Sequence, residues 1–246
     1  MRLTVICRRE LHAYFGSAGA YALLAIFALL SGYFFYSDLI FFVLFGSFTP
    51  SSGLWQLFFL DLRSVTLLIV PLITMRLLAE EKKLGTIELL WTYPVRDGEV
   101  VLGKFAAALI VYGAMLLPTA VGPAVLYHYH GFDVAPVLAG YAGMALLGAA
   151  FIACGLFFSS LSDNQVVSAM STYGALLLLW FLTWNEEVAR GDVMKWLLSV
   201  SLFDRFADFA RGAIDTEDVV FFALFAAFFV FLTWQSLATR AWRGVR

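Results

Sequence analysis

Charged residues are scarce in this sequence: they make up 14% of its 246 residues. A soluble domain of this size has roughly a quarter of its residues charged and about half apolar. Here 62% of the residues are hydrophobic, and the mean hydropathy is +0.85. One aqueous core cannot hide that much apolar surface, so we expect the chain to be dissolved in a lipid bilayer.

Residues that do chemistry are also few. A net charge of −2 gives no case for nucleic-acid binding. The two cysteines, Cys7 and Cys154, lie in different settings, and we expect no disulfide between them. His128 and His130, with Asp133, are two or three loose ligands, which we interpret as interfacial polar residues rather than a metal site. We see no catalytic set and predict neither a metal nor a cofactor in this chain.

Long apolar runs dominate what is present. A helix needs about 20 apolar residues to cross the hydrocarbon. Pro118 and Pro123 are expected to kink the third run. The fold class predicted is an all-α polytopic membrane protein forming one transmembrane domain over 1–246. Its six predicted spans cover 18–36, 58–78, 100–127, 136–158, 166–184 and 219–237.

Basic residues predict the orientation. Eleven of the 16 Lys and Arg residues lie before the first span, between or at the ends of the second and third, or after the sixth. The positive-inside rule places that side in the cytoplasm. We therefore expect both termini in the cytoplasm and the chain in the inner (cytoplasmic) membrane.

Two segments outside the spans have amphipathic patterns. Residues 1–16 carry Leu3, Ile6, Cys7, Leu11 and Tyr14 at helical spacing, with Arg8, Arg9 and His12 elsewhere on the wheel. This predicts a helix lying on the inner membrane surface. Residues 185–217 form an outer segment that we expect to contain short helices. Its apolar positions are Trp196, Leu197, Leu202, Phe203, Phe206 and Phe209.

Several weaker patterns have plainer interpretations. Residues Gly98 to Phe105 nearly match a Walker A loop, but Phe105 stands where Ser or Thr is required and no strand precedes it, so we do not predict a nucleotide site. Small residues recur along the fourth span, as at Ala139 and Gly143, and favour close packing within one subunit over a dimer seam. Asp61 and Arg63 are interpreted as interfacial charges.

The charged segment 79–98 is the most specific part of the chain. A short helix from about Gly85 to Trp91 is expected there, with Thr86 as its cap and Glu88 in its first turn. From composition alone this segment is an ordinary solvated loop.

The order of residues from 71 to 104 resembles the membrane subunit of type-2 ABC exporters. The layout of the rest is similar to that family, and the compact loops resemble its gliding-motility and copper-enzyme-maturation branches most. The matching residues are Pro71, Met75-Arg76, Glu80-Glu81-Lys82-Lys83, Gly85-Thr86, Glu88, Leu89-Leu90, Pro94 and Gly103-Lys104.

The resemblance implies a permease that binds a separate ABC ATPase, which carries ATP and Mg, and that pairs with a second permease as a homodimer or heterodimer. It implies that 79–98 is the coupling segment, with the helix carrying Arg8 and Arg9 nearby, and leaves room for an outer accessory membrane protein. Two alternatives stay open: an ion-gradient-driven secondary transporter, and a non-transporting anchor that relays ATPase motion to an outer partner. The residues expected to contact the ATPase are Glu80, Glu81, Lys82, Gly85, Thr86, Glu88, Leu89 and Pro94.

Overall fold

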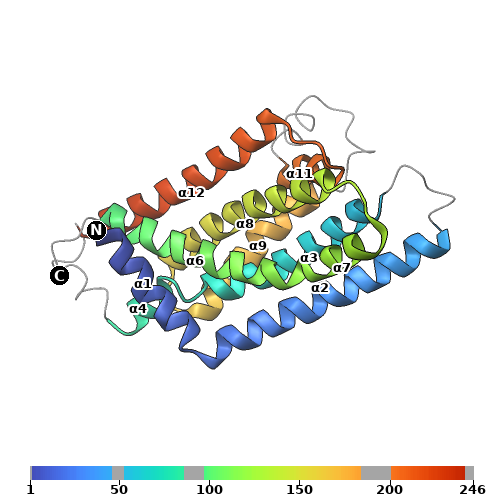
Figure 1. Cartoon of the computed structure of the whole chain (residues 1–246). Coiled ribbons are helices and arrows are strands. Elements are labelled where there is room, and N and C mark those ends of the chain that lie inside the picture. Colours follow the sequence, from blue (N-terminus) through green and yellow to red (C-terminus); the bar gives the residue numbers. More distant parts are fainter. Residues whose placement is uncertain (1, 46–52, 86–96, 184–200, 242–246) are drawn as a thin grey trace.

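A computed structural model describes residues 2–45, 53–85, 97–183 and 201–241. All regular structure in these ranges is helical, as predicted (Figure 1). The helices are α1 (Arg2–Phe15), α2 (Ala18–Phe45), α3 (Leu54–Thr74), α4 (Ala79–Lys83), α6 (Asp97–Thr119), α7 (Val121–His130), α8 (Ala135–Leu161), α9 (Gln165–Thr183), α11 (Leu202–Ala210) and α12 (Thr216–Ala241).

Five helical stretches in these ranges are long and apolar enough to cross a membrane. They correspond to five of the six predicted spans. The remaining one, in α9, has an apolar stretch of only Gln165–Phe181, just short of the same length. The structure therefore confirms a multi-pass helical protein, and the sixth span remains a prediction.

The predicted boundaries need two corrections. Helix α2 continues to Phe45 rather than ending near residue 36, because the residues after Asp38 are again apolar. The third span is two helices, α6 and α7, separated at Ala120. The break lies between Pro118 and Pro123, as the prolines predicted, and Pro123 has no N–H to bond a carbonyl in the preceding turn.

Helices α3 and α8 form the centre of the bundle. In the most apolar stretch of α8, 67% of residues are buried, against 11% in α2 and 17% in α12. Large side chains from neighbouring helices lie against glycines of α8. An added Cβ at Gly148 would be 2.1 Å from Tyr112, and one at Gly143 would be 2.5 Å from Phe209. The small residues of this helix thus serve packing within the subunit.

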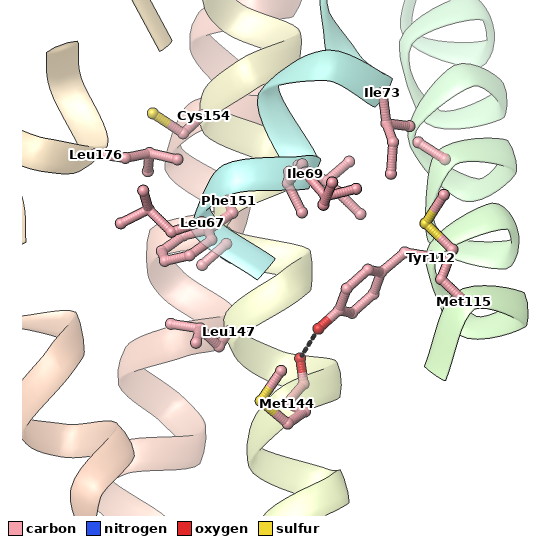
Figure 2. Close-up of a cluster of buried hydrophobic side chains, with 14 of the residues drawn as sticks. Leu67, Ile69, Ile73, Tyr112, Met115, Met144, Leu147, Phe151, Cys154 and Leu176 are labelled. Carbon is pink, nitrogen blue, oxygen red and sulfur yellow. Dashed lines mark hydrogen bonds between the residues drawn. The ribbon is translucent and has the colours of Figure 1, made fainter. Parts of the chain in front are cut away.

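Tyr112 of α6 shows how polar groups are satisfied in this core. Its ring is 2% exposed, and its hydroxyl donates to the carbonyl oxygen of Met144 at 3.1 Å (Figure 2). A buried hydroxyl without a partner is costly in an apolar setting, so this bond helps to fix α6 against α8.

The bundle has two distinct ends. Helices α1 and α4 lie at one end, which we call the α4 end, and α11 lies at the other, the α11 end (Figure 1). The end of α3, helix α4 and the beginning of α6, which carry the described part of the 71–104 pattern, lie at the α4 end, and the candidate site is there.

Candidate functional site: a buried charge cluster at the α4 end

The connection between α3 and α4 is fastened by side chains from distant segments. The Ser159 hydroxyl, near the end of α8, accepts from the backbone N–H groups of Leu78 and Ala79, both at 3.1 Å, and donates to the carbonyl of Met75 at 3.2 Å. One hydroxyl thereby uses its single donor and both acceptor positions. The turn between the two helices has its backbone groups satisfied and its shape fixed.

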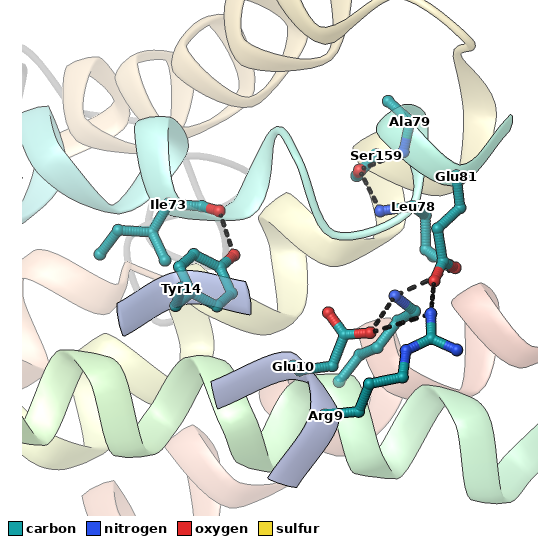
Figure 3. Close-up of polar contacts among 9 residues, drawn as sticks. Arg9, Glu10, Tyr14, Ile73, Leu78, Ala79, Glu81 and Ser159 are labelled. Carbon is teal, nitrogen blue, oxygen red and sulfur yellow. Dashed lines mark hydrogen bonds and ion pairs between the residues drawn. The ribbon is translucent and has the colours of Figure 1, made fainter. Parts of the chain in front are cut away.

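Helix α1 is joined to the same turn by Tyr14. Its hydroxyl donates to the carbonyl oxygen of Ile73 at 2.7 Å, at the end of α3 (Figure 3). Burial, followed by the nearby charge of Glu10, raises the pKa of Tyr14 well above its usual range. The hydroxyl therefore remains a donor at any physiological pH.

Lys104 is the centre of a charge cluster that joins three helices. Its side chain is 1% exposed, and its Nζ lies 3.0 Å from Glu10 Oε1 on α1 and 3.0 Å from Glu81 Oε2 on α4. Arg9 completes the set, with Nη2 2.7 Å from Glu81 Oε1 and 3.8 Å from Glu10 Oε1 (Figure 3). Lys104 and the two carboxylates are buried, whereas the Arg9 side chain is 62% exposed and meets the carboxylates from the solvent side. Two cations thus face two carboxylates, and the cluster as a whole is neutral.

Gly103 explains how α1 comes close enough for these contacts. A Cβ at this position would lie 2.8 Å from Cγ2 of Ile6, below any normal contact. Only a hydrogen allows α1 to pack on α6 at this point, which puts Glu10 within reach of Lys104. The Gly-Lys pair therefore has a structural role within the subunit.

The helical conformation of this stretch also argues against the Walker A interpretation. Residues 98 to 105 are helical and lie within α6, whereas a phosphate-binding loop needs an open turn with free backbone N–H groups. The ammonium of Lys104 is held by two carboxylates instead.

Helix α4 was not expected from the sequence. It starts after Leu78, and its Lys82 ammonium donates to the carbonyl of Ser160 in α8. It ends before Gly85, whose φ of +69° is the left-handed conformation that glycine adopts easily after a helix. The short helix is thus seated against the end of α8.

The predicted site residues fall into four groups. Glu81 and Arg9 belong to the Lys104 cluster, while Glu80, Lys82 and Gly85 lie in or directly after α4. Arg8 is exposed on α1. The remaining positions, Thr86, Glu88, Leu89 and Pro94, and the helix expected from Gly85 to Trp91, lie outside the described residues. The role of all these residues in ATPase contact stays a prediction.

The predicted apolar face of α1 is the face that packs on the bundle. Leu11 and Tyr14 contact the hydrophobic core, and Ile6 meets Gly103. Glu10 lies on this face with 9% exposure. Glu10 was not among the predicted site residues. The signal for it in the sequence was an acidic residue on the apolar face of an amphipathic helix, which needs a buried cationic partner.

The α11 end is organised differently. Arg63 of α3 donates to the carbonyl of Phe203 at 3.0 Å, and its guanidinium lies 5.1 Å from the Phe203 ring centre and 5.9 Å from that of Phe206. The predicted apolar positions of α11 pack inward: Leu202, Phe203, Phe206 and Phe209 are all buried. Trp196 and Leu197, also predicted there, lie outside the described residues.

Two of the histidines lie at the end of α7. His128 and His130 are exposed at the end of α7. In the ranges that the structure describes, no three His, Cys, Asp or Glu side chains are placed to hold a metal.

Residues 65–189 match the family model described as ABC-2 family transporter protein. This match covers half of the chain, including the end of α3, the α4 end and helices α6 to α9. The chain belongs to the ABC-2 transporter family. It is a multi-pass membrane protein and a permease subunit of an ABC transporter, and membership implies an ABC ATPase as its partner and a dimeric assembly. No curated protein matches the chain.

Proposed function

We propose that this permease couples ATP hydrolysis by a separate ATPase subunit to export or to mechanical work across the membrane. The observation that carries the proposal is the Lys104 cluster. It fixes α4, the beginning of the 79–98 segment, to α1 and α6, and its members Glu81 and Lys104 lie within the matched region. The protein holds no nucleotide in this scheme, since ATP and Mg bind to the partner.

The proposed topology has six spans, with α9 as the fifth, and puts the α4 end and both termini in the cytoplasm of the inner membrane. The excess of basic residues at this end supports that orientation. Helix α1 then lies at the inner membrane surface, with Arg8 directed outward and Glu10 inward.

In the proposed mechanism, motion of the ATPase passes into the membrane through helix α4. Closure of the ATPase pair pushes on segment 79–98, where Thr86, Glu88, Leu89 and Pro94 supply the contact surface. Because Glu81 is buried in the cluster, it holds α4 in place while the exposed part of the segment meets the ATPase. Displacement then passes to α3 through the Ser159 turn and to α6 through Lys104. In the dimer, the path between the subunits is lined by α2, α3 and α9.

The finer family placement is also part of the proposal. A gliding-motility or copper-enzyme-maturation type of permease has short outer loops and works with an outer accessory membrane protein, so the output at the α11 end is either a moved solute or a relayed motion. Stimulation of the ATPase without transport of any solute would indicate relayed motion rather than export.

An ion-driven transporter is the second candidate, and Asp38 is the observation that favours it. This residue of α2 is 8% exposed, and its Oδ2 has no hydrogen-bond partner within the described part of the chain. Buried acids in spans often bind protons or cations. Transport that persists when the partner cannot hydrolyse ATP, and that stops with Asp38→Asn, would support this candidate.

The experiment that tests the proposal is a mild-detergent pull-down of the tagged chain, with ATPase activity measured on the eluate. We expect an ATPase to copurify, and Glu88→Arg to reduce its association or activity. Asp215→Arg is the control, because this exposed carboxylate directly precedes α12 at the α11 end. A chain that copurifies with no ATPase, or equal loss from both variants, contradicts the proposal.

A further inference from the structure

Two adjacent hollows of opposite character lie beside the charge cluster. The first is a cavity of about 300 Å³ lined by residues of α1, α4 and the turn after α3. The second is a groove of about 220 Å³ between the beginning of α2 and the end of α3. Tyr14, Ser17 and Arg76 line both. The two hollows therefore form one elongated site.

The cavity presents one unmatched positive and one unmatched negative charge. Of the six charged residues that line it, Arg9, Glu10, Glu81 and Lys104 neutralise one another. The other two, Arg76 and Glu80, take part in no ion pair with any residue that the structure describes. Arg76 reaches over the first turn of α2, where its Nη1 would lie 3.5 Å from a Cβ at Gly19.

The groove is apolar. Apart from Tyr14, Ser17 and Arg76 at its polar end, it is lined by Gly19, Ala20, Ala22, Leu23, Leu72 and Met75. Small side chains on α2 leave the space open, and Leu23 and Leu72 supply apolar walls. A hydrocarbon chain is the ligand that such a surface suits in a membrane protein.

We propose that this site holds a zwitterionic phospholipid, with its phosphate on Arg76, its ammonium facing Glu80 and one acyl chain in the α2–α3 groove. Arg binds phosphate through paired charge-assisted hydrogen bonds. A lipid with net negative charge would leave Glu80 facing like charge, and a soluble phosphate would leave the groove unfilled. Glu80 lies in the proposed coupling segment, but lipid binding is measured without the ATPase, so failure of this site and failure of the proposed function are distinguishable.

Bound lipid would contact the helix that carries half of the charge cluster. Arg9 and Glu10 belong to both the cavity wall and the cluster, and Tyr14 links the cavity to α3. Lipid occupancy is therefore expected to stabilise α1 in its docked position.

The test is native mass spectrometry of the full-length protein after delipidation, titrated with dioleoylphosphatidylethanolamine and with dioleoylphosphatidylglycerol. We expect the wild type to prefer the ethanolamine lipid. Arg76→Gln should weaken binding of both lipids about tenfold, the loss of one charge-assisted contact. Glu80→Gln should abolish the preference, and Ala20→Phe should weaken binding by filling the groove.

Arg8→Gln is the matched control, because it removes a positive charge from α1 next to Arg9, at a residue that does not line the cavity. Arg76→Lys, which keeps the charge but cannot form both of the paired bonds, is the second variant if Arg76→Gln does not remain monodisperse; it should bind both lipids more weakly than the wild type. Equal binding of the two lipids by the wild type overturns the zwitterionic assignment. Unchanged binding by both Arg76→Gln and Ala20→Phe, or competition by glycerophosphoethanolamine as strong as that of the intact lipid, overturns the site.

Discussion

The two ends of the bundle hold their short helices by different physics. At the α4 end, ion pairs around the buried Lys104 join segments that are far apart in sequence: Lys104 and Glu10 are separated by 94 residues, and Arg9 and Glu81 by 72. At the α11 end, a helix with one apolar face packs its Phe residues on α8, and Arg63 lies over two of the rings. In the first arrangement, removing one charged partner leaves another charge buried and costs much stability. In the second, removing one apolar contact costs only that contact.

This difference indicates what each end does. A buried ion pair adds little net stability compared with apolar packing, but it is strongly destabilised when one partner is lost, and it favours one geometry. We infer that the α4 end is built to keep α1, α4 and α6 in fixed relation while force is applied. At the opposite end, α11 shields the apolar core of the bundle with its buried face.

The largest effect is expected from Lys104→Met. This change leaves Glu10 and Glu81 buried without their central cation, which costs about 3–5 kcal/mol. Thermal unfolding in detergent, followed by intrinsic tryptophan fluorescence, should show a large drop in Tm. The double variant Lys104→Met with Glu81→Gln should recover part of the loss. A single variant as stable as the wild type would show that the cluster is not a structural requirement.

Arg63→Gln tests the α11 end and should cost less, about 2–3 kcal/mol. It removes a charge-assisted bond to the Phe203 carbonyl and contacts with two aromatic faces. The same unfolding assay measures it, with Arg211→Gln as a control because that side chain is 61% exposed. A loss larger than that of Lys104→Met would reverse the comparison between the two ends.

Gly103→Ala sharpens the account of the α4 end. Overpacking against Ile6 costs about 1–3 kcal/mol, and the better helix propensity of alanine offsets up to about 1. Gly113→Ala on the same helix is the control, because nothing lies within 4 Å of its new Cβ, and it should be neutral or stabilising. Adding Ile6→Ala to Gly103→Ala should relieve the clash. A failure of this rescue would argue against close α1–α6 packing.

The smallest effect is expected from Glu217→Gln. Arg205 pairs with Asp218 at 2.7 Å and with Glu217 at 3.1 Å; burial lowers the pKa of Arg205, but the hydrogen bonds that it donates to these two carboxylates outweigh burial and raise that pKa. Because Glu217 is 80% exposed, solvent screens its contact with Arg205, and Arg205 keeps its shorter contact with the buried Asp218 in this variant; a loss of about 0.5–1 kcal/mol is expected. High salt should shrink the difference from the wild type. An effect as large as that of Lys104→Met would mean that surface pairs also hold this end.

Local patterns were sufficient to predict most of the helices. The apolar face of α1, the break near Pro118 and Pro123, and the buried face of α11 all follow from spacing within one segment. The partners of Lys104 and the three contacts of Ser159 depend on how distant segments meet, so periodicity could not reveal them. The family pattern marked Gly103-Lys104 as special, but only the fold shows that the glycine admits Ile6 and that the lysine is buried.

The most direct test of the account is site-specific photocrosslinking in membrane vesicles. A photoreactive residue at position 88, in the 79–98 segment, is compared with one at Tyr129, which is 76% exposed at the end of α7. The account predicts that position 88 crosslinks to a nucleotide-binding ATPase and that position 129 does not. A crosslink from 129 and none from 88 would contradict the assignment of the α4 end as the side on which the ATPase acts.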